Sequence, residues 1–183
     1  MPVQIGAKSH SFSDPTGLLS DCHRRIEMFL GSLQTVACGE ARLDDERHRA
    51  LDLALRYFRE SAPKHTADEE ESLFPRLESV NDPEVKAALA KVEGLERDHR
   101  AAERLHRRVD ELGSRWLEAG ELSAGDLAEF RKAVARLGEI YPGHIEVEDA
   151  VLFPAAARAL SSQQKAEIAA EMAERRSVKP VTL

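Results

Sequence analysis

The sequence contains no long apolar run and few residues that break helices. No stretch approaches the roughly 18 consecutive apolar residues of a membrane-spanning helix, and no charged segment followed by an apolar core opens the chain. We therefore expect a cytoplasmic protein without a membrane partner. The 10 glycines and 8 prolines among 183 residues lie mostly at expected helix ends, and no stretch alternates apolar and polar residues as a strand would. These absences predict an all-α protein.

Cysteines are also scarce, and basic residues are outnumbered by acidic ones. The 26 Lys and Arg residues against 33 Asp and Glu residues give a net charge of -7, and the two signs are interleaved. No concentrated basic face is available for a phosphate backbone, so we expect no nucleic-acid partner. The two cysteines, Cys22 and Cys38, belong to one expected helix. A rise of about 1.5 Å per residue places them roughly 24 Å apart, which excludes a disulfide bond between them.

Apolar residues recur at three- and four-residue steps in four long segments and one shorter segment. The expected helices cover about residues 15–38, 45–77, 83–119, 123–152 and 161–176. Short connections favour antiparallel neighbours, which predicts an up-down-up-down four-helix bundle with an extra C-terminal helix. The expected organisation is an N-terminal arm at 1–13, the bundle at 14–160, the helix at 161–176 and a tail at 177–183. In the fourth helix, both Val151 and Leu152 are expected to face inward.

An internal repeat carries the chemistry of this chain. Residues 63–75 read PKHTADEEESLFP and residues 142–154 read PGHIEVEDAVLFP. Residues 22–27, CHRRIE, and 98–103, DHRAAE, repeat more weakly in the helices before them. The chain therefore contains two copies of a helical hairpin, each with one histidine on its first helix and a His-x-x-x-Glu pair on its second. The prolines at 63 and 142 are expected to bend both second helices.

The repeated histidines and glutamates are expected to point into the core. Residues four positions apart lie on one face of an α-helix, and these residues continue the apolar stripes. An unpartnered buried carboxylate costs several kcal/mol, and no Lys or Arg shares the stripes nearby, which favours a metal site. In the acidic run 68–71 only Glu69 has the register of a ligand, and the other residues are expected to be solvated. The predicted ligands are His23, His65, Glu69, His99, His144 and Glu148.

With this signature the chain resembles hemerythrin-like proteins of the HHE cation-binding family over about residues 14–160. The Leu-Phe-Pro endings at 73–75 and 152–154 are also typical of that group. The resemblance implies a non-haem di-iron centre within a four-helix bundle. Glu69 and Glu148 would bridge the two iron ions together with an oxo or hydroxo group, and the four histidines would be terminal ligands. Such a set fills about ten of roughly twelve coordination positions and leaves room for dioxygen, peroxide or nitric oxide.

This chain departs from the oxygen-carrying members of the family at two positions. Those members have a His-x-x-x-His pair on the third helix, where this chain has Glu103 four residues after His99. Their last carboxylate is an aspartate five residues after the fourth-helix histidine, where this chain has Glu148 at four and Asp149 at five. More carboxylates stabilise ferric iron, which favours oxidant chemistry, iron handling or peroxide turnover over reversible oxygen transport. Whether the protein is an enzyme stays open, with peroxide consumption and ferrous-iron oxidation as the candidate activities.

The identity of the metal and the role of the C-terminal helix stay open as well. Zinc or manganese could occupy the same ligands and only stiffen the bundle, because histidine and carboxylate suit several divalent metals. The C-terminal helix could cover the bundle or form a homodimer. Several further residues are candidates for additional ligands, for hydrogen-bonding partners of the ligands, or for plain core and surface positions. They are Glu27, Glu103, His106, Tyr141 and Asp149.

Overall fold

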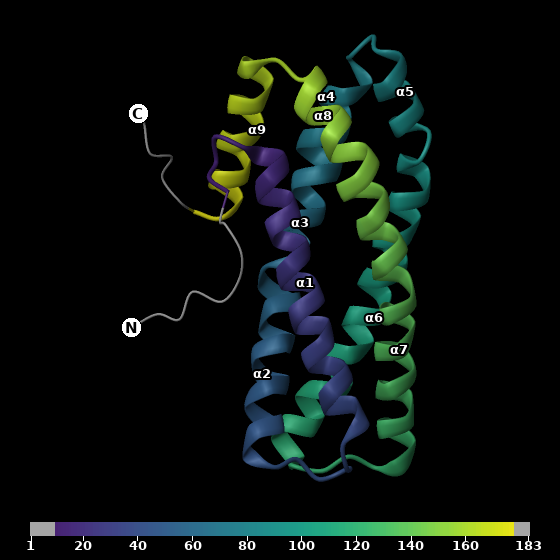
Figure 1. Ribbon diagram of the computed structural model, residues 1–183. Coiled ribbons are helices and arrows are strands. Elements are labelled where there is room, and N and C mark those ends of the chain that lie inside the picture. Colours follow the sequence, from purple (N-terminus) through teal and green to yellow (C-terminus); the bar gives the residue numbers. More distant parts are fainter. Residues whose placement is uncertain (1–9, 178–183) are drawn as a thin grey trace. The chain divides into compact units, whose positions relative to one another are not determined.

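The computed structural model describes residues 10–177, and within this range the backbone is helical with no strand (Figure 1). The predicted all-α class, a helical bundle with an additional C-terminal helix, is confirmed. Residues 1–9 of the expected arm and 178–183 of the expected tail lie outside the described residues. The helices are α1 (Pro15–Cys38), α2 (Asp45–Glu60), α3 (Ala62–Ala67), η1 (Asp68–Leu73), α4 (Phe74–Glu78), α5 (Pro83–Leu89), α6 (Val92–Ala119), α7 (Ala124–Val147), η2 (Glu148–Leu152), α8 (Phe153–Ala159) and α9 (Ser162–Arg175).

The chain divides into two compact units that share three long helices. The first unit comprises the described parts of Met1–Arg25, Lys64–Gly94 and Ile145–Leu183. The second comprises Ile26–Pro63 and Leu95–His144. No helix in the described range has the length and apolar character needed to cross a bilayer.

The second unit is built from α2 and from parts of α1, α6 and α7, and short connections join α1 to α2 and α6 to α7 (Figure 1). Asp44 caps α2, and its side chain accepts a hydrogen bond from the backbone N–H of Arg47. The core centres on Trp116, which is fully buried and lies edge-on to Phe130 with ring centroids 5.3 Å apart. Trp116 Nε1 donates a 2.6 Å hydrogen bond to the carbonyl of Ala41. This bond anchors the loop between α1 and α2 to the core of the unit.

The first unit contains the two π-helices and the C-terminal helix. Helix α5 contacts α4, α8 and η2, and α9 contacts η1. A capping box starts α9, in which Ser161 and Gln164 satisfy each other's backbone N–H groups. Ile168, Met172 and Ala173 on α9 are fully buried. Helix α9 therefore packs on its own chain, which is one of the two roles that the sequence left open.

Each second helix of the repeat widens into a π-helix at its glutamate, where the sequence had predicted continuous α-helix. The N–H of Phe74 binds the carbonyl of Glu69, and the N–H of Phe153 binds the carbonyl of Glu148, both five residues back. Each widened turn precedes a proline, at 75 or 154. A proline clashes with the carbonyl four residues earlier in an α-helix, and the wider turn relieves that clash.

The π-helices overturn two expectations about which side chains face inward. Val151 was expected in the core but is 36% exposed, whereas the next residue, Leu152, is buried. Asp68 was expected to be solvated but is fully buried. The extra residue in each wide turn changes the rotation of its neighbours about the helix axis, which a strict 3.6-residue period does not anticipate.

The two prolines expected to bend the helices act differently. Near Pro63 the helix is interrupted, because α2 ends at Glu60 and α3 begins at Ala62. At Pro142 helix α7 continues without interruption from Ala124 to Val147. The helix bounds thus differ between the two copies at the repeated proline, and the expected bends stay predictions.

Candidate metal centre

Four of the six predicted ligands meet in the first unit. His23 comes from α1, His65 from α3, Glu69 from η1 and Glu148 from η2, and their ligand atoms all lie within 4.8 Å of one another. All four side chains are buried, and both carboxylates are fully buried. Two imidazoles and two carboxylates in one buried cluster form a donor set that suits a divalent or trivalent metal ion.

The contacts inside this cluster pair each histidine with one glutamate. His23 Nε2 lies 3.1 Å from Glu148 Oε2, and His65 Nε2 lies 3.3 Å from Glu69 Oε1. The two imidazole rings are edge-on, with centroids 4.8 Å apart. The pairs therefore follow the repeat only in part. His65 pairs with Glu69 of its own copy, whereas His23 of the first copy pairs with Glu148 of the second.

Asp149 holds the far side of the His23 ring. His23 Nδ1 donates to Asp149 Oδ1 at 3.0 Å, and Ser20 Oγ donates to the same oxygen at 2.7 Å. Arg24 Nη2 donates to Asp149 Oδ2 at 2.7 Å. A carboxylate on one imidazole nitrogen is the usual support for a metal bound at the other nitrogen, because it fixes the tautomer and the ring orientation. Of the additional candidate residues, Asp149 thus contacts this cluster directly.

The electrostatics of the cluster favour a cation. Burial opposes a charge on His23, but hydrogen bonds to Asp149 and Glu148 outweigh it and raise the pKa of His23 to about 9. Burial likewise opposes ionisation of Asp149, and hydrogen bonds from His23 and Ser20 nevertheless lower its pKa. The metal-free protein therefore carries a proton on His23 at neutral pH. A metal ion at this position would replace that proton as the positive charge among the carboxylates.

The other two predicted ligands, His99 and His144, lie together in the second unit. Their Nε2 atoms share a hydrogen bond of 3.0 Å, and their ring centroids are 4.6 Å apart. His144 is buried, and its Nδ1 lies 3.7 Å from Asp98 Oδ2. The structure therefore presents the predicted ligands as a set of four in one unit and a pair in the other.

His106 and Tyr141 form a separate hydrogen-bonded pair in the second unit. His106 Nε2 lies 2.8 Å from the Tyr141 hydroxyl, and the His106 ring stacks on Phe58 with centroids 4.1 Å apart. Burial lowers the pKa of His106 to about 4, so this imidazole is neutral at physiological pH. Glu27 and Glu103, the other candidate carboxylates, are exposed. Neither belongs to a metal-binding cluster among the described residues.

Sequence reasoning missed the fixed environment of Asp68, next to Glu69. Asp68 Oδ1 accepts a 2.9 Å hydrogen bond from Arg175 of α9. No local signal could have found this partner, because the two residues are 107 positions apart in the sequence.

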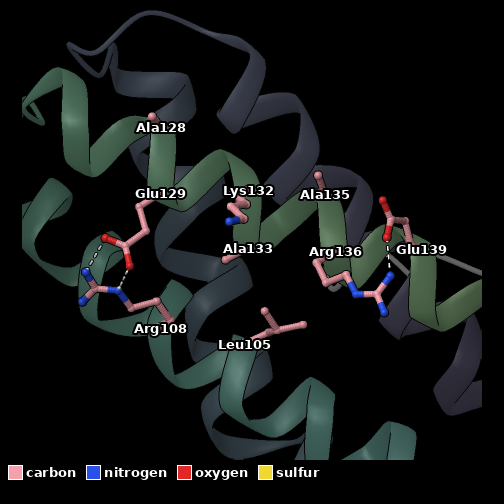
Figure 2. A pocket seen from close by; sticks show the side chains of 9 residues that line it. All are labelled: Leu105, Arg108, Ala128, Glu129, Lys132, Ala133, Ala135, Arg136 and Glu139. Atoms are coloured by element: carbon pink, nitrogen blue, oxygen red, sulfur yellow. Dashed lines mark hydrogen bonds and ion pairs between the residues drawn. The ribbon is translucent and has the colours of Figure 1, made fainter.

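A surface hollow in the second unit is separate from these residues. It lies along α6 and α7 and is lined by Leu105, Ala133 and several charged side chains (Figure 2). Four of these charged side chains form two ion pairs, Arg108 with Glu129 and Arg136 with Glu139. None of the predicted metal ligands lines the hollow, so it is not part of the candidate centre.

A comparison with protein families agrees with this arrangement. The model of the hemerythrin HHE cation-binding domain matches residues 14–156. The chain belongs to this family. An HHE domain binds cations, and the buried His and Glu cluster lies within the matched residues. A similar protein from Haemophilus influenzae is 27% identical over 177 residues, which cover 92% of this chain and 94% of that protein. That relative is described as an "Uncharacterized protein" and adds no activity.

Proposed function

We propose that this HHE domain holds a non-haem di-iron centre with which it binds, senses or turns over small oxidants, or handles iron. The observation that carries the proposal is the buried cluster of His23, His65, Glu69 and Glu148, with ligand atoms within 4.8 Å of one another. Iron accepts both imidazole and carboxylate ligands. The family match to a cation-binding domain supports the same assignment.

The proposed ligand set keeps the six residues predicted from the repeat. Glu69 and Glu148 are assigned as bridging carboxylates, together with an oxo or hydroxo group. The two buried carboxylates supply negative charge for the metal, and Asp149 keeps Nε2 of His23 turned toward Glu148. Bound iron would supply redox chemistry and open positions for dioxygen, peroxide or nitric oxide. The terminal ligands are assigned as His23, His65, His99 and His144.

We further propose a cytoplasmic protein whose ligand is a small diatomic molecule or a peroxide. The two versions of the function differ in turnover. A peroxide-consuming or ferrous-iron-oxidising enzyme gives multiple turnovers per centre, whereas a sensor or an iron store gives a spectral change without them. Peroxide consumption and ferrous-iron oxidation measured on the same iron-loaded sample separate these versions.

The deciding experiment is the metal content of untagged protein, with its near-ultraviolet spectrum before and after dithionite. We expect about two iron ions per chain and charge-transfer bands that bleach on reduction. The variant with both Glu69→Ala and Glu148→Ala should lose nearly all iron. The matched control carries Glu27→Ala and Glu103→Ala, which removes two exposed carboxylates from the same bundle and should keep its iron. Full iron in the first variant would disprove the ligand assignment.

A structural zinc or manganese site is the second candidate. The observation in its favour is that the cluster joins three separate helical segments, which are α1, the continuous stretch of α3 and η1, and η2, so a redox-inactive ion could cross-link them. In that case the protein contains zinc or manganese even after iron-supplemented expression. Dithionite would then leave its spectrum unchanged.

A further inference from the structure

The last turn of the C-terminal helix reaches the π-helix that carries Glu69. Arg175 Nη1 donates to Asp68 Oδ1 at 2.9 Å and to Ser72 Oγ at 2.9 Å. Arg175 Nη2 donates to Glu71 Oε2 at 3.1 Å. One guanidinium therefore binds three side chains of η1, near its start and toward its end.

A second guanidinium completes the binding of Asp68. Arg176 Nη2 lies 2.6 Å from Asp68 Oδ2, so each oxygen of this fully buried carboxylate has its own arginine. Burial opposes the charge on Arg176, but the hydrogen bond to Asp68 outweighs it and raises its pKa. Arg176 also contacts the thiol of Cys22. Asp68 precedes Glu69 and Cys22 precedes His23, so this arginine contacts the neighbours of two proposed ligands.

A π-turn needs such external support. Its hydrogen bonds span five residues, and π-helices are rare and occur mostly as single wide turns. In η1 the turn includes Glu69 itself. If the contacts of α9 were lost, η1 could adopt other helical registers, and each of them would rotate Glu69 away from its present direction.

We propose that Arg175 and Arg176 are positioning residues: through Asp68 they hold η1 in the π conformation that aims Glu69 into the metal cluster. The inference rests on the proposed function, since it assigns α9 a task in metal binding. The second sequence copy uses a different device, because Asp149 beside Glu148 is held by Ser20, His23 and Arg24 from α1. The C-terminal helix lies outside the repeat. It holds the aspartate beside Glu69 of the first copy, as α1 holds the aspartate beside Glu148 of the second.

The test compares Arg175→Gln and Arg176→Gln with Lys165→Gln in the full chain. Lys165 also lies on α9 and loses a positive charge in this variant, as the arginines do, but its Nζ donates to the carbonyl of Ala157 at 2.6 Å, and both arginines stay on Asp68. Two readouts are used: hydrogen exchange of the η1 amides in metal-free protein, and the rate at which iron-loaded protein releases iron to excess bipyridine under reducing conditions. We expect both rates to rise at least tenfold in the arginine variants. In the control both should stay within about twofold of wild type.

The outcomes separate this inference from the proposed function. Wild-type rates in folded arginine variants would overturn the positioning role, and so would equal acceleration in Lys165→Gln, since loosening of α9 in general would then suffice. If wild-type protein binds no iron, the proposed function fails, while the hydrogen-exchange comparison still decides whether α9 holds η1. Should Arg175→Gln not fold, Arg175→Lys takes its place. Lysine keeps the charge but cannot hold Asp68, Ser72 and Glu71 in one planar fork, so faster exchange is expected there too.

Discussion

The Nδ1 atom of His23 donates a 3.0 Å hydrogen bond to Oδ1 of Asp149, a residue 126 positions away in the sequence. This contact fixes the imidazole so that its other nitrogen lies 3.1 Å from Glu148. Adjacent residues of η2 therefore act on both sides of one ring. The arrangement explains why an acidic pair, Glu148 and Asp149, follows the second-copy histidine: one carboxylate faces the cluster and the other supports it.

Asp149→Asn is expected to weaken metal binding without removing a ligand. An amide keeps the size of the side chain but loses the charge that stabilises the His23 N–H and makes the ring a better ligand. Loss of such a support typically lowers metal affinity by about 10–100-fold. Competition against a chelator of known affinity measures the change. Asp52→Asn, which removes only an exposed pair with Arg56, is the control and should leave the affinity unchanged. An affinity of Asp149→Asn within twofold of wild type would contradict the supporting role.

Glu27→Gln and Glu103→Gln should each retain the full iron content of the wild type. Both carboxylates lie one turn after a proposed histidine ligand, yet both are exposed in the structure. Metal analysis of the single variants after iron-supplemented expression tests this directly. A loss of half the iron or more in either variant would show that the residue is a ligand and that the side chain turns inward when metal binds.

The protein should lose stability at acidic pH partly through His106. Its pKa is lowered by burial to about 4, below the unfolded value of 6.5, so the unfolded chain takes up this proton first as the pH falls. The folded state consequently loses about 2 kcal/mol between pH 7 and pH 5 from this group. Urea unfolding of metal-free protein at both pH values should show a smaller loss in His106→Phe than in wild type. The exposed His48→Gln should behave as wild type, and an equal loss in His106→Phe would rule out this origin.

Trp116→Phe is expected to destabilise the second unit by about 3 kcal/mol. The smaller ring removes the hydrogen bond to the Ala41 carbonyl and leaves a gap in a fully buried position. Urea unfolding followed by circular dichroism measures the loss, since the variant lacks the single tryptophan of the chain. Leu53→Ala at a 54% exposed position should change the free energy of unfolding by less than about 0.5 kcal/mol. Similar values for the two variants would contradict a core role of the indole.

The sequence predicted the candidate site well where the signal is local and repeated. His65 and Glu69 lie four residues apart on an apolar stripe, and His144 and Glu148 repeat this spacing in the second copy. Such a spacing places both side chains on one helix face whatever the rest of the chain does. The prediction that these residues are buried is correct for both pairs, and so is the prediction for His23.

The sequence failed where a helix departs from its regular period. Asp68 and Val151 were placed on the wrong face because the wide π-turns before Pro75 and Pro154 change the rotation of nearby residues. The Leu-Phe-Pro repeat was visible, but its effect on the hydrogen-bonding pattern was not. That effect depends on a balance between a proline clash and the packing of the whole turn.

By itself the sequence determined the all-α class, the duplicated hairpin and the chemical types of the proposed ligands, because periodicity and i to i+4 spacing act within a single helix. Only the tertiary structure decided which carboxylates support the site. Asp149 meets His23 and Asp68 meets Arg175 across more than 100 residues of sequence. Such pairings depend on how separate helices pack, and no local pattern encodes them. The same packing decided that α9 lies against η1 of its own chain.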